Sequence, residues 1–386
     1  MLAKFFALAA LKLLKSALLK HSGCLALMPS SDHLSGSLNL FTSDQSQAMP
    51  DTSAELSTSL PVQEEVQKKV TPGDTVDART VHAMTVDVED YFHVAALAKA
   101  IKPEDWDNWP SRVERNTQRL LALFDEKKIK ATFFVLGWVA DRYPEIVKDI
   151  VAQGHELASH GYTHQLVYSQ TPEVFRAESE RSKKLLEDIS GQQIEGYRAA
   201  SYSITKKSLW ALDILSELGF TWDSSIFPVH HDRYGIPGSP EQPYEIQTNE
   251  AIIKELPLTT AKVAGLTLPA AGGGYFRQYP YPLSRYLFKK AANKAIARAD
   301  KHHSTQNRPT LSETSQIFYL HPWEIDPDQP KVGNISRFSR FRHYTNLDKC
   351  YTRLERMIDD FHFGRVSDCF QAAADLPRIK IDELAA

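Results

Sequence analysis

The sequence has little cysteine, no strong charge bias and no long uninterrupted hydrophobic run. Its three cysteines, Cys24, Cys350 and Cys369, form no closely spaced pair, which argues against a disulfide framework and against a thiolate zinc site. The net charge is only −3 at pH 7, so there is no excess of positive charge to hold nucleic acid. The composition therefore indicates a globular protein without a nucleic-acid partner.

Residues 1–27 are apolar and basic, but lysines interrupt them throughout. No apolar run reaches the about 20 residues that a membrane-spanning helix requires, and the continuous apolar stretch of a signal peptide is also missing. Lys4, Lys12 and Lys15 fall on one side of a helical wheel, which favours an amphipathic helix lying on a membrane surface. We expect a cytoplasmic protein that this segment can attach to the inner membrane surface. Alternatively, translation begins further along the chain and the mature protein lacks this segment.

The remaining chain divides into a linker and a folded domain. Residues 28–80 are rich in Ser, Thr, Asp, Gln and Pro without sustained periodicity, and we interpret them as a disordered linker. In residues 81–386, short apolar runs alternate with amphipathic helical patterns, which indicates an α/β domain with parallel strands in a barrel or an open sheet. Strands are expected at 82–88, 130–137, 155–160, 194–201, 220–225 and 316–326, helices at 111–129, 144–153, 171–191, 205–219 and 346–364, and long loops after residue 228.

Polar side chains gather where the expected strands end. They are Asp87, Glu89 and Asp90 after the first strand, then His160, His164, Arg198, Asp223, His321 and Glu324 after later ones. In parallel α/β proteins, active sites are built at this edge of the sheet. The distribution therefore predicts an active site.

The two histidines and one of the carboxylates suit a catalytic metal. His160 and His164 are four residues apart, so a single helical turn leaving the strand would place both imidazoles on one side. Two imidazoles and one carboxylate leave positions open for water and substrate. In an extended strand, Asp87 and Glu89 face the same way, which favours them as the base and the metal ligand. Asp90 is the alternative ligand, or it orients one.

Two further side chains complete the predicted chemistry. A guanidinium at Arg198 beside the base carboxylate would fix its orientation and favour its charged form. His321, followed by Pro322 and Trp323, would protonate a leaving amine from outside the metal's shell.

Together, these motifs resemble the polysaccharide deacetylases with a NodB homology domain, family 4 of the carbohydrate esterases. The resemblance is closest to the subgroup associated with exosortase and extracellular-polysaccharide loci. It covers roughly residues 82 to 365, including a C-terminal helical extension, and it rests on the motifs "TVDVED", "SHGYTH", "GYRAAS", "WDSSIFP" and "YLHPW".

The resemblance implies a distorted (β/α) barrel, a divalent metal that is most often Zn²⁺, and removal of acetyl groups from amino sugars. Matched motif by motif, it implies Asp87 as the base, Arg198 as its partner and His321 as the acid. It implies His160 and His164 as metal ligands together with Glu89 or Asp90. It also implies a substrate pocket formed by Asp223, Phe227, Leu320 and Trp323.

Two positions depart from the family pattern. Val88 follows Asp87, where most members have a second Asp, and Ala200 replaces the usual Pro, which is expected to loosen the turn after Arg198. The segment "GGGYFR" (272–277) fits the subgroup, and the alternative interpretation of its glycines is a flexible surface loop near the site. The predicted function is N-deacetylation of a polysaccharide or its lipid-linked precursor. The alternatives are a catalytically weak or inactive carbohydrate-binding module of the same fold and an amide or imide hydrolase with a non-glycan substrate.

Overall fold

The computed structural model describes residues 80–231, 233–302, 314–371 and 376–385. The predicted amphipathic segment at 1–27, and all but the last residue of the predicted linker at 28–80, lie outside the described residues. Among the described helices, none is long and apolar enough to cross a membrane.

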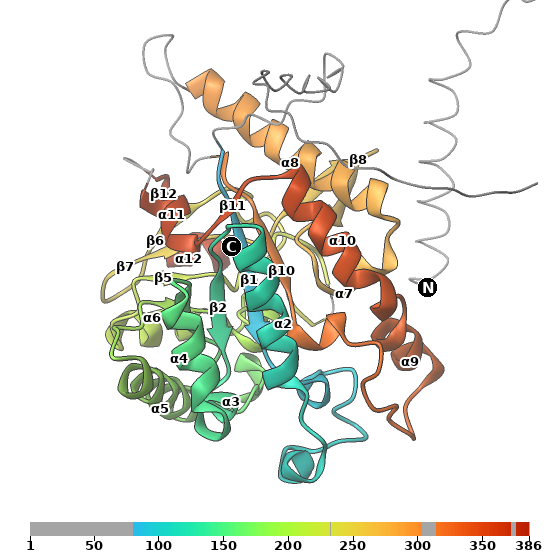
Figure 1. Ribbon diagram of the computed structural model, residues 1–386. Helices are drawn as coiled ribbons and strands as arrows, with labels where there is room; N and C mark the ends of the chain where they lie inside the picture. The colour runs from blue at the N-terminus through green and yellow to red at the C-terminus, as the bar shows by residue number, and fades with distance from the viewer. Residues whose placement is uncertain (1–79, 232, 303–313, 372–375, 386) are drawn as a thin grey trace, which may run out of the picture. The chain divides into compact units, whose positions relative to one another are not determined.

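A ten-stranded, mostly parallel sheet forms the centre of the described domain (Figure 1). Neighbouring strands pair in parallel, except that β6 and β7 are antiparallel. The short strand β11 (Phe363–Gly364) pairs with β1 outside the main path. Along that path, the strands are β10 (Ile317–Leu320), β1 (His82–Val88), β2 (Thr132–Val135), β3 (Glu156–Ser159), β4 (Gly196–Tyr197), β5 (Trp222–Asp223), β7 (Ile252–Glu255), β6 (Tyr244–Gln247) and β12 (Arg378–Lys380).

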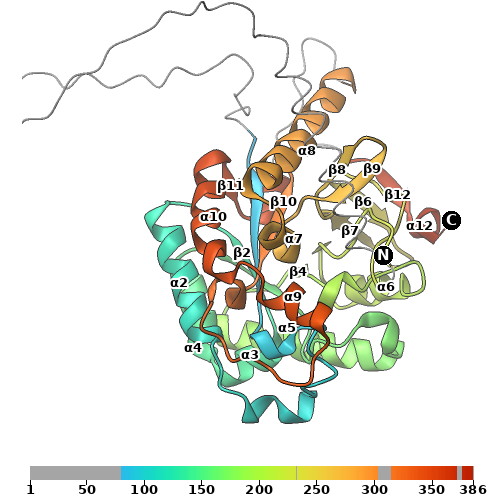
Figure 2. The ribbon, with the colours of Figure 1, turned by 90° about the vertical axis from the view of Figure 1, so that its right-hand side faces the viewer.

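Helices surround the strands in both ribbon views (Figures 1 and 2). They are α2 (Val113–Glu126), α3 (Gly137–Arg142), α4 (Pro144–Ala152), α5 (Pro172–Ser190), α6 (Trp210–Glu217), α7 (Gly273–Gln278), α8 (Tyr281–His302), α9 (Arg337–Tyr344), α10 (Leu347–Asp360), α11 (Val366–Gln371) and α12 (Ile381–Ala385). The predicted start and end of α5 are confirmed. The Thr171 side chain accepts a hydrogen bond from the Val174 N–H at the start, and Gly191 ends the helix at φ +67°.

The segment that follows β7 closes the strands into a distorted barrel. The Leu256 and Leu258 N–H groups donate to the carbonyls of Asp223 and Ile226, which continues the pairing of β7 with β5. The Thr259 hydroxyl then donates to the Ile317 carbonyl of β10 at 2.8 Å and accepts from the Ile317 N–H at 2.8 Å. These bonds join the two sides of the sheet and confirm the predicted fold class.

The strand register aligns the carboxyl ends of the parallel strands. Val88, Val135, Ser159, Tyr197 and Asp223 lie opposite one another in successive strands. On the other side of β1, Val86 lies opposite Leu320. The residues that come next in each strand therefore meet at a single edge, and these include the predicted catalytic side chains.

The structure corrects the prediction of long loops after residue 228. This region contains β6, β7, the hairpin β8 (Thr260–Val263) and β9 (Leu266–Pro269), and the helices α7 and α8. These four strands have four residues each, so their alternation is too short to separate them from loops by pattern alone.

The prediction of a flexible surface loop at 272–277 is also wrong. Gly273–Gln278 forms α7, and Gly272, at φ +120°, pairs with Tyr319 in an isolated bridge. A Cβ at Gly272 would lie 2.1 Å from the Tyr319 carbonyl oxygen. The glycine is therefore needed for close contact between two backbones.

Candidate metal and catalytic site

Asp87, near the end of β1, is held by a fully buried arginine. Arg198 Nη1 donates to Asp87 Oδ1 at 2.6 Å and to the Thr85 hydroxyl at 2.8 Å. Its other nitrogens donate to the carbonyl and hydroxyl of Ser224 at 3.1 and 3.0 Å. The guanidinium also lies over the ring of Phe134, 3.9 Å from its centroid. Arg198, itself held by these contacts, therefore fixes the position of one carboxylate oxygen of Asp87, Oδ1.

Tyr202 holds the other oxygen of Asp87. Its hydroxyl donates to Asp87 Oδ2 at 3.3 Å, and burial, followed by the charge of Asp87, raises the pKa of Tyr202 well above its ordinary value. The turn that brings Tyr202 here is tightly bonded, because the Ala199 N–H donates to the Ser225 hydroxyl at 2.8 Å and the Ser203 hydroxyl donates to the Ala200 carbonyl at 2.6 Å. The effect of Ala200, in place of Pro, on this turn stays a prediction.

Glu89, His160 and His164 form a cluster suited to a metal ion. One coordinating atom from each lies within 4.8 Å of the others, and His164 Nε2 is 2.8 Å from Glu89 Oε2. His160 Nδ1 bonds the Arg198 carbonyl at 2.9 Å, which sets the tautomer in which Nε2 carries a lone pair. His160 Nε2 is buried without a hydrogen-bond partner, as expected of an atom that would bind an ion.

The surroundings of two members of the cluster, His160 and Glu89, favour their deprotonated forms. Burial lowers the pKa of His160 to about 4, so the imidazole is neutral at physiological pH. Burial raises the pKa of Glu89, but the contact with His164 and the nearby His321 and His160 outweigh burial and hold this pKa far below its usual range. A neutral imidazole and an ionised carboxylate are the forms that bind a divalent cation.

The backbone between the two histidines differs from the predicted helical turn. It is a tight loop in which Gly161 has φ +74° and His164 has φ +54°. Two backbone bonds hold this loop against α3, since Gly137 N–H donates to the Gly161 carbonyl at 2.8 Å and Trp138 N–H donates to the Tyr162 carbonyl at 3.0 Å. The imidazoles nevertheless meet, with ring centroids 5.2 Å apart.

Asp90 lies outside this cluster because its oxygens are already occupied. Its carboxylate accepts hydrogen bonds from the N–H groups of Tyr91, Arg112 and Val113 at 2.9, 2.6 and 3.0 Å, and from the Ser111 hydroxyl at 2.8 Å. Asp90 thus caps a short helix at 91–93 and ties it to the start of α2. Of the two carboxylates, Glu89 is the one whose oxygen lies close enough to His160 and His164 to share a metal ion with them.

Replacing Asp90 tests this structural role. Asp90→Asn should lower the free energy of unfolding by about 1–3 kcal/mol, because an amide places donors against the backbone N–H groups that the carboxylate bonds. Bound metal should stay near the wild-type amount. Denaturant unfolding and metal analysis of the same preparation check both points, and loss of the metal without loss of stability would make Asp90 a ligand.

His321, directly after β10, faces both carboxylates. Its Nε2 lies 3.8 Å from Asp87 Oδ2 and 3.5 Å from Glu89 Oε1, while Nδ1 lies 3.1 Å from Glu324 Oε2. Burial lowers the pKa of His321, but the hydrogen bond with Glu324 and the charges of Glu89, Glu324 and Asp87 raise it to about 9. Its side chain is 17% exposed. A protonated imidazole that solvent can reach is suited to donating a proton.

Parts of this chain match known protein families. Residues 105–222 match the family model described as polysaccharide deacetylase. The chain carries a polysaccharide deacetylase domain. Residues 224–299 and 301–371 match a second model, described as a domain of unknown function. His160, His164 and Arg198 fall in the first match and His321 in the second, so both matched regions meet in this site.

Relatives of the deacetylase domain are similar over part of their length. The peptidoglycan deacetylase of Helicobacter pylori is 29% identical over 130 residues, which is 34% of this chain and 43% of that protein. The chitooligosaccharide deacetylase of Rhizobium leguminosarum bv. trifolii is 27% identical over 115 residues, 30% of this chain and 49% of that protein. The chain thus spans less than half of these curated relatives.

A solved structure supports the fold of the deacetylase domain. It is the crystal structure of a candidate polysaccharide deacetylase from Mycobacterium smegmatis, with a TM-score of 0.50 and 22% identity. The match covers 81% of this chain and 98% of that one.

The four residues predicted to form a substrate pocket are all buried. Asp223 accepts hydrogen bonds from the N–H and hydroxyl of Ser225 at 3.1 and 2.7 Å, and Phe227 and Leu320 are each 1% exposed. The Trp323 indole donates to Glu89 Oε1 at 3.2 Å and stacks on His321. The contact of these four residues with substrate stays a prediction.

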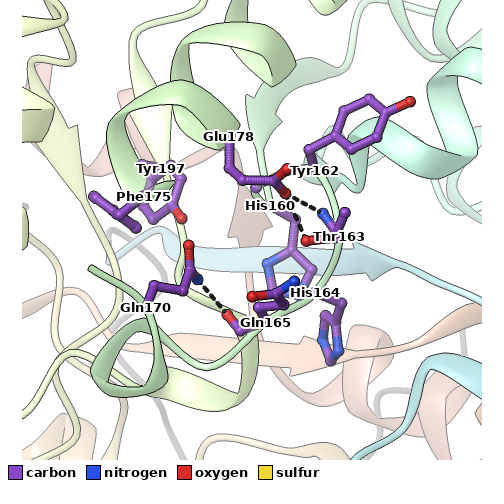
Figure 3. A pocket seen from close by; sticks show the side chains of 11 residues that line it. His160, Tyr162, Thr163, His164, Gln165, Gln170, Phe175, Glu178 and Tyr197 are labelled. Atoms are coloured by element: carbon purple, nitrogen blue, oxygen red, sulfur yellow. Dashed lines mark hydrogen bonds between the residues drawn. The ribbon is translucent and has the colours of Figure 1, made fainter. Parts of the chain in front are cut away.

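A pocket lies beside the histidine loop of the deacetylase domain (Figure 3). Glu178, on α5, accepts a hydrogen bond from the Thr163 N–H at 3.0 Å, and Gln170 Nε2 donates to the Gln165 carbonyl at 3.0 Å. Figure 3 shows these side chains around His160 and His164. They hold the loop in place from the side.

Proposed function

We propose that this chain is a metal-dependent hydrolase that removes N-acetyl groups from the amino sugars of a polysaccharide or of its lipid-linked precursor. The observation that carries this proposal is the meeting of three parts at one sheet edge: the Asp87–Arg198 pair, the Glu89 cluster and the protonated His321. These parts are spread over positions 87 to 321 of the sequence. We therefore expect the predicted domain, residues 81–386, to act as one catalytic unit.

Glu89, His160 and His164 would hold the metal. Two imidazoles and one carboxylate form a ligand set typical of catalytic zinc, with positions left for water and substrate. The orphaned Nε2 of His160 and the ionised Glu89 support this assignment. When bound, a divalent cation supplies Lewis acidity to the acetyl carbonyl and lowers the pKa of water.

Asp87 would accept the proton of the attacking water. Arg198 and Tyr202 hold one oxygen each, so the carboxylate cannot rotate away, and the buried guanidinium supplies the opposite charge that a buried carboxylate requires. Proton transfer by a positioned group contributes about 10²–10⁴-fold to a rate.

His321 would give its proton to the departing amine. Glu324 binds Nδ1 at 3.1 Å, so the proton on Nε2 points toward Asp87 and Glu89, where the scissile bond would lie. An amine leaves poorly as an anion, so its nitrogen needs this proton before the C–N bond breaks.

Acetate release from N-acetylglucosamine oligomers tests the proposal. The zinc-loaded protein should release acetate and leave free amino groups in equal amounts. Binding of the oligomers without acetate release would instead indicate a carbohydrate-binding module of this fold. Activity limited to small cyclic amides or imides would indicate a non-glycan hydrolase.

A further inference from the structure

Arg277 is a fully buried arginine whose contacts the proposed chemistry does not yet use. It is 1% exposed and lies on α7, in the region that matches the domain of unknown function. Nε donates to Glu324 Oε1 at 2.6 Å. Nη1 donates to the carbonyls of His343 and Thr345 at 2.8 and 2.9 Å, and Nη2 donates to the Arg342 carbonyl at 3.2 Å.

Glu324 connects Arg277 to the proposed acid. One oxygen of its carboxylate accepts from Arg277, and the other bonds His321 Nδ1 at 3.1 Å and accepts from the His321 N–H at 3.2 Å. Glu324 is 1% exposed. A carboxylate buried this deeply needs a positive charge beside it to remain charged and correctly oriented. Arg277 supplies a permanent positive charge in direct contact with Glu324, next to the titratable His321.

Stacked aromatic rings form a second connection between Arg277 and His321. The Arg277 guanidinium carbon lies 5.1 Å from the centroid of the Trp323 ring. Trp323 stacks between His321 and His343, with centroid distances of 5.2 and 4.6 Å. Arg277 thus reaches His321 through both a carboxylate and an aromatic ring, and α7, α9 and the segment after β10 join at this point.

We propose that Arg277 is a positioning residue for the proton donor, acting through Glu324 to hold His321 in the orientation that aims Nε2–H at the leaving nitrogen. This inference rests on the proposed deacetylase function. It gives the region of unknown function a chemical role, because His321, Glu324, Trp323 and Arg277 all lie within it and form the acid half of the site.

Leaving-group dependence tests this proposal. A leaving amine needs a proton, whereas the nitrophenolate of p-nitrophenyl acetate leaves without one. Arg277→Gln should therefore lower kcat for N-acetylglucosamine oligomers by about 10–100-fold, within the range of general acid catalysis, with little change in KM. Hydrolysis of p-nitrophenyl acetate should fall by less than about threefold. Arg277→Lys, which keeps the charge but not the fork of donors, should lose less kcat than Arg277→Gln.

A second variant and a control guard against misfolding. Glu324→Gln preserves side-chain volume and should show the same selective loss. It can therefore replace Arg277→Gln as the test if that variant does not fold. Arg353 donates to the carbonyls of Phe276, Arg277 and Tyr279 at 3.2, 2.7 and 3.1 Å, so it supports the same segment, and no bond joins it to Glu324. Arg353→Gln should show no selectivity between the two substrates.

The outcomes separate the two claims. An equal loss on both substrates in Arg277→Gln and Glu324→Gln, or no loss on either substrate, would overturn the positioning role. A wild-type protein that releases no acetate from either substrate would overturn the proposed function itself.

Discussion

Asp87→Asn is expected to abolish deacetylation while leaving the metal bound. The substitution keeps the shape of the side chain and removes its capacity to accept a proton. Asp87 bonds Arg198 and Tyr202 and is not a member of the Glu89, His160 and His164 cluster. Turnover of N-acetylglucosamine oligomers should fall by at least about 10²–10⁴-fold, the contribution of a positioned base.

Acetate release and metal content should be measured on the same preparation of the Asp87→Asn protein. Retained turnover would remove Asp87 from the role of base. Loss of the metal together with turnover would make it a ligand. Tyr202→Phe is a useful companion, because it removes the 3.3 Å hydrogen bond to Asp87 and leaves the bond from Arg198 in place, so it should reduce turnover far less.

Glu89→Gln is expected to release the metal. The amide has almost the same size as the carboxylate, but it removes the one negative charge in the cluster. Metal affinity should fall by more than the about 10–100-fold that follows loss of a group outside the coordination shell. Replacing His160 or His164 with Ala should have a similar effect, because each removes one of the three ligands.

Asp90→Asn is the matched control for Glu89→Gln. Both variants exchange a buried carboxylate for an amide at adjacent positions, but only Glu89 belongs to the cluster. Elemental analysis after dialysis should therefore show metal in the Asp90 variant and little in the Glu89 variant. The reverse result would exchange the roles of the two residues.

Local signals in the sequence predicted the first half of the barrel well. The strand expected at 82–88 matches β1, since every position in it is buried and its residues favour strands. Strand pleating predicted that Asp87 and Glu89 face the same way. In the structure both face His321, while Asp90 points away and caps the helix at 91–93. The His160 and His164 pair came together as predicted, although by a loop containing left-handed residues instead of a helical turn.

The parts that could not be predicted depend on contacts between distant residues. Arg277 and Glu324 are separated by 47 positions, and no local pattern distinguishes a buried arginine from an exposed one. Tyr202 reaches Asp87 through backbone at φ +55°, which residue type alone does not indicate. Glu324 carried a local signal, because it stands three positions after His321 and beyond Pro322, in a spacing typical of a helix cap.

The most direct test of the central claim is removal and return of the metal in the wild-type protein. A chelator should abolish acetate release from N-acetylglucosamine oligomers, and one equivalent of Zn²⁺ per chain should restore it. Glu89→Gln should gain no activity at the same concentration. Acetate release that persists in chelated protein shown to be free of metal would contradict the account.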